Sequence, residues 1–171
     1  MLRWLSFLRR DGDLVPHEEG EYERILVPLK LGLLGDEVLA TAIKLAGEHH
    51  ARIEVLHVVR VPLALPLDAD LGDEEAAAGA TIAEAKLAAA DHGVEIDGKV
   101  ARSRALGEAI VEEASATGAD LVLLGSAPRW RRQSRFFSPT VDYVLRHSPS
   151  DVMVVSYPEG VLEEEETMVE A

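Results

Sequence analysis

The residue types best suited to chemistry gather in one segment, residues 125–140, which reads GSAPRWRRQSRFFSPT. A glycine here ends an apolar run, and the segment then leads into a helical pattern, an arrangement that can hold phosphate on backbone amides. The segment also carries arginines, whose guanidinium groups bind carboxylates and phosphates through paired hydrogen bonds. It therefore predicts an anion site, with the candidate residues Gly125, Ser126, Arg129, Arg131, Arg132, Ser138 and Thr140.

The same side chains have a second interpretation. The arginines could solvate an exposed loop and pair with acidic residues of a partner subunit, where each ion pair contributes little. Trp130, Phe136 and Phe137 could stack on a base, or they could anchor the loop to the core. Both pairs of alternatives stay open at the level of the sequence.

Other chemistry finds little support in the sequence. The chain has no cysteine, which excludes disulfides, thiolate nucleophiles and Cys-ligated metals. It contains neither a complete GxxxxGK[ST] phosphate loop nor an HExxH zinc motif. His49 and His50 are adjacent and cannot share a helix face. His57 is interpreted as a strand-end residue, and His147 as a last-turn residue that complements the helix dipole. We predict no metal site and no catalytic residue.

An open parallel sheet is the structure that would position the candidate residues. Short apolar runs rich in β-branched residues alternate with segments of helical periodicity, and Gly93 and Gly118 are placed to end two of the helices. Asp97 and Gly98 weaken one strand, as a bulge or an edge position would explain. Parallel strands need helices on both faces and right-handed crossovers. The prediction is a doubly wound, Rossmann-like α/β fold with strands near residues 25–27, 52–59, 94–101, 120–124 and 152–155, and helices near 38–46, 73–92, 106–117 and 140–147.

In such a sheet, ligands bind beyond the carboxyl ends of the strands, where the strand order reverses. This rule selects the loops after the first, second and fourth strands, which are residues 29–35, the segment from Val59 onward, and residues 125–139. Lys30 and Val58, near the ends of the first two strands, therefore join the candidate ligand-binding residues.

Composition bounds the class of protein. With 171 residues, 47% hydrophobic and 28% charged, the chain fits one globular domain, and its formal net charge of -14 argues against nucleic acid as a partner. We expect an N-terminal extension over residues 1–20, a domain over 21–158 and an acidic tail over 159–171. The opening MLRWLSFLRR could form an amphipathic helix that touches a membrane surface or a partner, or it could pack on the body. Its apolar stretch is too short for a signal peptide or a membrane span, so we expect a cytoplasmic protein.

Five segments, taken in order, carry a family resemblance: RILVPLK, AIKLA, RIEVLHVV, GADLVLLGS and VLRHSPSDVMVV. Together they resemble the successive landmarks of the universal stress proteins. The resemblance implies a homodimer formed through the last strand, with Val152, Val154 and Ser156 at the interface. It also implies an adenine nucleotide, ATP or AMP, as the ligand of the family's nucleotide-binding branch.

The glycine pattern of that branch is mostly missing here. Gly125 matches its first position, but Pro128 and Ser138 replace two glycines, and Pro139 replaces a hydroxyl residue. Proline offers no amide donor, and glycine alone lets the backbone approach phosphate closely. An acidic residue expected after the first strand is replaced by Lys30. The departures weaken the case for ordinary ATP or AMP binding and favour an anion bound by side chains.

Three functions remain in view. The first is a homodimeric regulatory or binding protein whose ligand is an anion of the adenine-nucleotide type, held in a noncanonical way. The second is a ligand-free interaction module, since FFSPTVDYVLR resembles stress-protein domains fused to the cytoplasmic end of amino-acid transporters. The least supported is an enzyme that hydrolyses phosphate anhydrides. The sequence favours the first.

Overall fold

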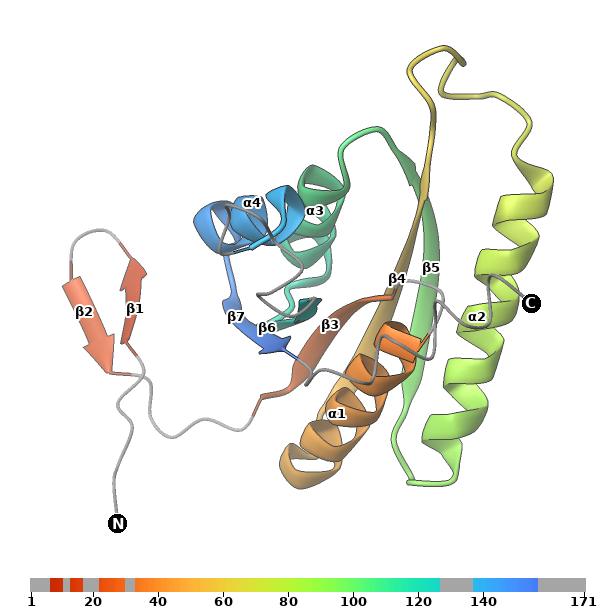
Figure 1. Ribbon diagram of the computed structural model, residues 1–171. Helices are drawn as coiled ribbons and strands as arrows, with labels where there is room; N and C mark the ends of the chain where they lie inside the picture. The colour runs from red at the N-terminus through yellow and green to blue at the C-terminus, as the bar shows by residue number, and fades with distance from the viewer. Residues whose placement is uncertain (1–6, 11–12, 17–21, 30–32, 127–136, 157–171) are drawn as a thin grey trace.

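The computed structural model describes residues 7–10, 13–16, 22–29, 33–126 and 137–156. Its main sheet has five parallel strands in the order β5-β4-β3-β6-β7, with helices on both faces (Figure 1). This architecture confirms the predicted doubly wound α/β fold. The elements of this domain are β3 (Arg24–Leu29), α1 (Leu33–His49), β4 (Arg52–Arg60), α2 (Gly72–Ala90), β5 (Ile96–Ser103), α3 (Leu106–Thr117), β6 (Leu121–Ser126), α4 (Pro139–His147) and β7 (Asp151–Ser156).

The central strands are apolar on both faces because helices cover both. Successive residues of β3 point to opposite sides: Ile25 and Val27 pack with α1 and α2, whereas Leu26 packs with α3 and α4. All three side chains are fully buried. The continuous hydrophobic runs of the sequence therefore reflect a sheet buried between two layers of helices.

Asp120 fastens the amino-terminal end of β3 to the start of β6. Its carboxylate accepts hydrogen bonds from the backbone amides of Glu23, at 2.8 Å, and Arg24, at 3.2 Å. Its own amide donates to the carbonyl of Arg24. One short side chain thereby joins two strands that lie far apart in the sequence.

Two glycines end helices as predicted, and another permits close packing. Gly93 and Gly118 have positive φ angles of 69° and 64°, in the left-handed region that glycine favours. Gly98 lies on β5, which is an edge strand of the sheet, as the sequence suggested. A Cβ at Gly98 would lie 2.1 Å from Cγ2 of Ile82, so α2 can approach β5 closely only because this position has no side chain.

Several sequence expectations were wrong in detail. β3 does not end before Pro28 but continues to Leu29, and His57 lies inside β4 rather than at its end. Residues 7–10 are not helical: β1 (Phe7–Arg10) pairs antiparallel with β2 (Asp13–Pro16). The two residues between these strands in the sequence are Asp-Gly, a pair typical of two-residue hairpin connections, and this signal was overlooked. Among the helices of the described residues, none is long and apolar enough to cross a bilayer.

The contact between Gly98 and Ile82 predicts the effect of two glycine substitutions. Gly98→Ala should lower the free energy of unfolding by about 1–3 kcal/mol, because the new methyl group overpacks the side chain of Ile82. Gly79→Ala, in α2 with no atom within 4 Å of the added Cβ, should raise it by about 0.5–1 kcal/mol. Urea unfolding of both variants measures the difference, and equal stabilities would contradict the packing described here.

Candidate functional site

The strand order reverses between β3 and β6, and there the sheet is joined only briefly. β3 pairs with β4 up to Leu29 opposite His57, but it pairs with β6 only through Ile25–Leu121 and Leu26–Val122. Pro28 has no backbone amide, and the ladder with β6 stops two residues before it. The carboxyl-terminal parts of β3 and β6 therefore share no ladder at the place where ligands of this fold class bind.

The predicted site residues divide into those that the structure describes and those that it does not. Gly125 and Ser126 form the end of β6, opposite Val155 and Ser156 of β7, and the side chain of Ser126 is buried. The candidates Lys30, Arg129, Arg131 and Arg132, together with Pro128, lie outside the described residues. The described candidates come from β6, the start of α4, and β4.

Val58 does not lie at a strand end, since β4 continues to Arg60. Its half-buried side chain packs on the α3–α4 side of the sheet, in the same cluster as Val141 and Phe137. Phe137 thus belongs to the core at the start of α4, which supports the anchoring interpretation for this residue. Trp130 and Phe136 lie outside the described part.

The amino terminus of α4 satisfies most of its own donors. Ser138 is the N-cap, and its hydroxyl accepts a hydrogen bond from the amide of Val141 at 3.3 Å. Pro139 occupies the first helical position and has no amide. Of the first three helical residues, only Thr140 keeps an amide that no described group accepts. Asp142, in the same turn, adds a negative charge. This helix start is therefore a poor cradle for phosphate.

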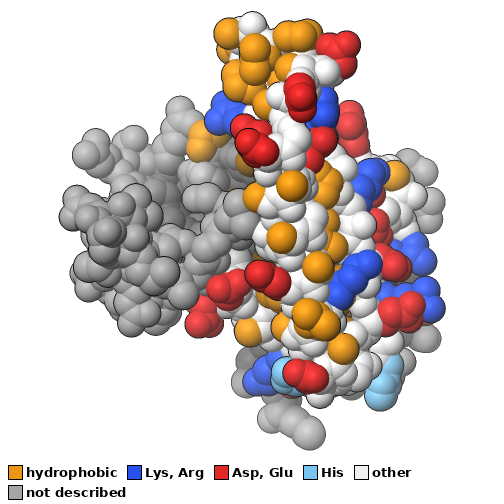
Figure 2. Space-filling model, turned by 90° about the vertical axis from the view of Figure 1, so that its right-hand side faces the viewer, with side chains coloured by type: hydrophobic (Ala, Val, Ile, Leu, Met, Phe, Trp, Pro, Cys, Tyr) orange, Lys and Arg blue, Asp and Glu red, His pale blue; other side chains and the backbone are white. Residues whose placement is uncertain are grey.

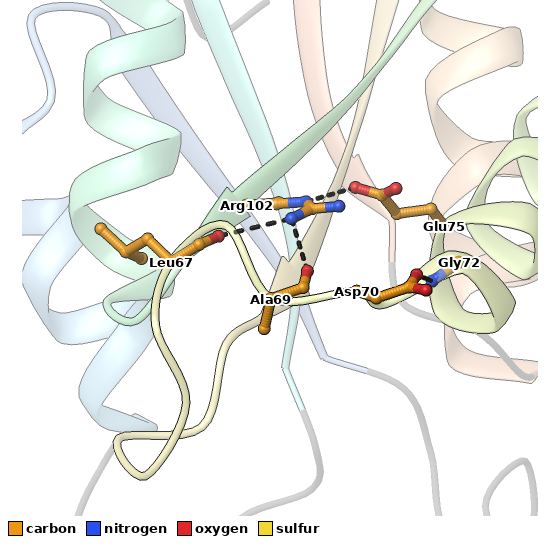
Figure 3. A network of polar contacts seen from close by, with 6 residues as sticks. All are labelled: Leu67, Ala69, Asp70, Gly72, Glu75 and Arg102. Atoms are coloured by element: carbon orange, nitrogen blue, oxygen red, sulfur yellow. Dashed lines mark hydrogen bonds and ion pairs between the residues drawn. The ribbon is translucent and has the colours of Figure 1, made fainter.

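Arg102 of β5 and Arg104, just after this strand, hold the loop between β4 and α2 in place, and Figure 3 shows the contacts of Arg102. The guanidinium of Arg102 donates to the carbonyls of Leu67, at 3.4 Å, and Ala69, at 2.7 Å, and its Nε pairs with Glu75 of α2 at 2.5 Å. Arg104 donates to the carbonyl of Leu65 at 2.7 Å. The ion pair between Arg102 and Glu75 lowers the pKa of the Glu75 carboxyl and raises the pKa of the Arg102 guanidinium.

The tip of this loop is apolar and exposed. Leu63, Leu65 and Leu67 expose 86%, 40% and 54% of their surfaces. Hydrophobic side chains of this region gather at the top of Figure 2, with acidic side chains beside them. Sequence reasoning treated the segment only as a wall of the ligand site, although its alternating leucines were a visible signal.

His57 is a buried polar residue that the sequence interpretation misplaced. It is 9% exposed, and its Nδ1 has no hydrogen-bond partner in the described part of the chain. It lines a pocket of about 480 Å³ under the first turns of α2, together with Arg60, Asp73 and Glu74. Burial lowers the pKa of the His57 imidazole, because the protonated ring loses hydration there.

A buried carboxyl group lies on the opposite face of β4. Glu113 of α3, whose side chain is 8% exposed, pairs with Lys99 of β5 at 2.5 Å. Burial and the neighbouring Glu113 raise the pKa of Glu54. Within the residues that the structure describes, no group of three or more acidic, histidine or cysteine side chains is arranged to hold a metal ion.

Comparison with known proteins assigns the chain to a family. Residues 21–156 match the model of the universal stress protein family. The chain belongs to this family. No curated protein sequence matches this universal stress protein. The match to the family model confirms the resemblance inferred from the sequence, and the sheet topology agrees with this assignment.

Solved structures show the same fold. A universal stress protein from Lactobacillus plantarum is 24% identical, with a TM-score of 0.66 over 80% of this chain and 99% of that one. A universal stress protein in complex with cAMP is 20% identical, with a TM-score of 0.61 over 80% and 98% of the two chains. One from Archaeoglobus fulgidus, in complex with dAMP, is 17% identical, with a TM-score of 0.59 over 78% and 98%. At these identities, the likeness establishes the fold.

The buried His57 predicts how stability depends on pH. Its folded-state pKa lies below the ordinary 6.5, so the unfolded chain binds the proton more readily, and stability falls as pH drops from above 6.5 toward the folded-state value. His57→Leu should remove this fall. The raised pKa of Glu54 has the opposite effect, since it makes stability rise as the pH drops. His57→Leu should therefore be compared with its parent in proteins that both carry Glu54→Gln.

Urea unfolding between about pH 8 and about pH 5 measures this dependence. His147→Gln is the control, since it removes an exposed imidazole and keeps His57. An unchanged acid-side fall in His57→Leu would show that another group causes it.

Proposed function

We propose that this universal stress protein is a cytoplasmic, homodimeric regulatory protein that binds an anion of the adenine-nucleotide type through side chains. The start of α4 carries the proposal: Pro139 lacks an amide, and Ser138 uses the amide of Val141 for its own cap. Because only the amide of Thr140 is left to bind an anion there, the positive charge that holds the anion must come from Lys30 and the arginines of residues 129–135. Relatives solved with cAMP and dAMP support adenine nucleotides as the class to test.

The proposed dimer uses β7, which is the edge of the sheet on the side away from β5. An edge strand offers backbone amides and carbonyls that a second copy can pair with. Val152 and Val154 pack partly against the core, and Ser156 is exposed at the strand end. Exposed Met153 gives this edge an apolar side chain that a partner would cover.

Thermal unfolding with ATP, ADP, AMP, cAMP and dAMP tests the nucleotide site. A ligand that binds the native state raises its stability, by about 2.7 kcal/mol at a hundred times Kd. We expect a concentration-dependent rise in Tm that is lost when Arg131 and Arg132 are changed together to alanine, and reduced in Lys30→Asp. Arg52→Ala is the matched control, because Arg52 lies at the amino end of β4, away from the site. No shift with any nucleotide would refute the proposed site.

A second function, an interaction module that binds a protein such as a transporter, is supported by the apolar loop tip. Leu63, Leu65 and Leu67 are costly to leave in water, and Arg102 and Arg104 hold the backbone that carries them. A loop fixed before binding loses less entropy when it docks. The acidic side chains nearby would suit a partner with an apolar groove and a basic rim.

The arginine contacts of this loop can be tested without a partner. Arg102→Gln removes the pairing with Glu75 and weakens the hold on Leu67 and Ala69, so limited proteolysis within residues 62–70 should become several-fold faster. Arg60→Gln is the control, since Arg60 is an exposed arginine of the adjoining strand with no ion pair in the described residues. Equal cleavage rates in the two variants would contradict the role of Arg102.

A further inference from the structure

A groove between α1 and α2 lies on the face of the sheet opposite α3 and α4. Its volume is about 630 Å³, within the range of about 300–1,000 Å³ that small-molecule sites occupy. The apolar side chains of Leu29, Leu39, Ile43 and Ala85 line it, and each of these residues is buried. The groove is formed by different residues from those of the nucleotide site proposed at the sheet edge.

Small side chains keep this groove open. Ala40 of α1 faces it from one side, and Thr81, Ala85 and Ala88 of α2 face it from the other. A leucine at any of these positions would occupy part of the space. Beneath the groove, Val27 and Val55 are fully buried, so the core of the sheet is closed and the space lies above it. The alanine-rich sequence of α2 therefore produces a groove on a complete core.

The charged residues of the groove are divided between its two ends. α1 and α2 run in the same direction, because each returns the chain between parallel strands. Asp36 and Glu84 lie toward the beginnings of the lining segments, and Lys44 and His92 lie toward their ends. His92 Nδ1 donates to the carbonyl of Ala88 at 3.0 Å, so Nε2 of the neutral ring is an acceptor and offers no hydrogen bond to an anion. Lys44 has no ion-pair partner among the described residues.

An anionic group fits the end of the groove at which Lys44 lies. The negative end of a helix dipole acts within the last turn. Lys44 lies more than one turn before the end of α1 at His49, so its full charge outweighs that effect. Asp36 and Glu84 would repel the same group at the other end. These charges would orient a ligand with an apolar chain, so that its anionic group lies near Lys44 and away from Asp36 and Glu84.

We propose that this groove binds a small amphiphile, a medium-chain carboxylate, with its chain on Leu39, Ile43 and Ala85 and its carboxylate at Lys44. The apolar walls supply most of the affinity, since each methylene that enters the groove is removed from water. The ammonium of Lys44 supplies the preference for a carboxylate. Binding here would add a second ligand class to the protein, independent of any nucleotide.

Titration calorimetry of the full chain with decanoate, decanol and decyltrimethylammonium tests the proposal. We expect saturable binding of decanoate, weaker binding of decanol, and the weakest binding of the cationic probe. Lys44→Gln should weaken decanoate about tenfold and leave decanol unchanged. Lys86→Gln, an exposed lysine of α2 that does not line the groove, should leave both affinities unchanged.

Substitutions that fill the groove with a larger side chain provide a second test of the proposal. Ala88→Leu should weaken decanoate at least tenfold, whereas Ala83→Leu, the same change at an exposed position of α2 outside the groove, should have no effect. Both substitutions keep a strong helix former, so the Tm of each variant shows that the fold is intact. No saturable binding of decanoate, or equal affinity in Ala88→Leu and Ala83→Leu, would overturn the proposal. Equal affinity for the anionic and cationic probes would overturn it as well.

Discussion

The burial of β3 on both of its faces is the constraint on which the rest of the structure depends. Ile25, Leu26 and Val27 are excluded from water only if helices cover both sides and strands flank both edges. β4 and β6 pair with the two edges of β3, α1 covers one of its faces, and α3 and α4 cover the other. Because β4 and β6 come from opposite halves of the chain, the order of the sheet must reverse beside β3. The burial of one strand thereby determines where a ligand site can form.

The helices on the two faces of the sheet differ in what they leave free for a ligand. On one side, α4 begins with a serine cap and a proline, which complete its own hydrogen bonds and leave little for a phosphate. On the other side, α1 and α2 leave a groove because alanines face it. Two structures of universal stress proteins are solved with cAMP and dAMP. In this chain, the first three residues of α4 leave only the amide of Thr140 without a described acceptor, and a groove lies between α1 and α2.

Sequence patterns predicted the order and type of nearly every element in the main sheet, because each depends on local signals. A run dense in β-branched residues marked β4, an unbroken apolar run marked β6, and Gly118 marked the end of α3. The groove, the buried Nδ1 of His57 and the contacts of Arg102 with Leu67 and Ala69 could not be predicted in this way. Each arises when residues from separate elements meet, and the partners of Arg102 lie 33 and 35 positions away. The hairpin could have been found, since Asp-Gly separates its strands.

The short ladder between β3 and β6 has a consequence for how the protein opens. β3, β4 and β5 form one half of the sheet from a continuous stretch of chain, and β6 and β7 form the other. Two residue pairs and the hydrogen bonds of Asp120 join the halves at β3 and β6, and side-chain packing together with the Lys99–Glu113 ion pair adds the contacts of the helices. Cooperative units of unfolding commonly coincide with such contiguous segments. The two halves of the sheet are therefore the units that we expect to open cooperatively, and such opening has to break the contacts that α1 makes with β3 and β4 on one side and with β6 on the other.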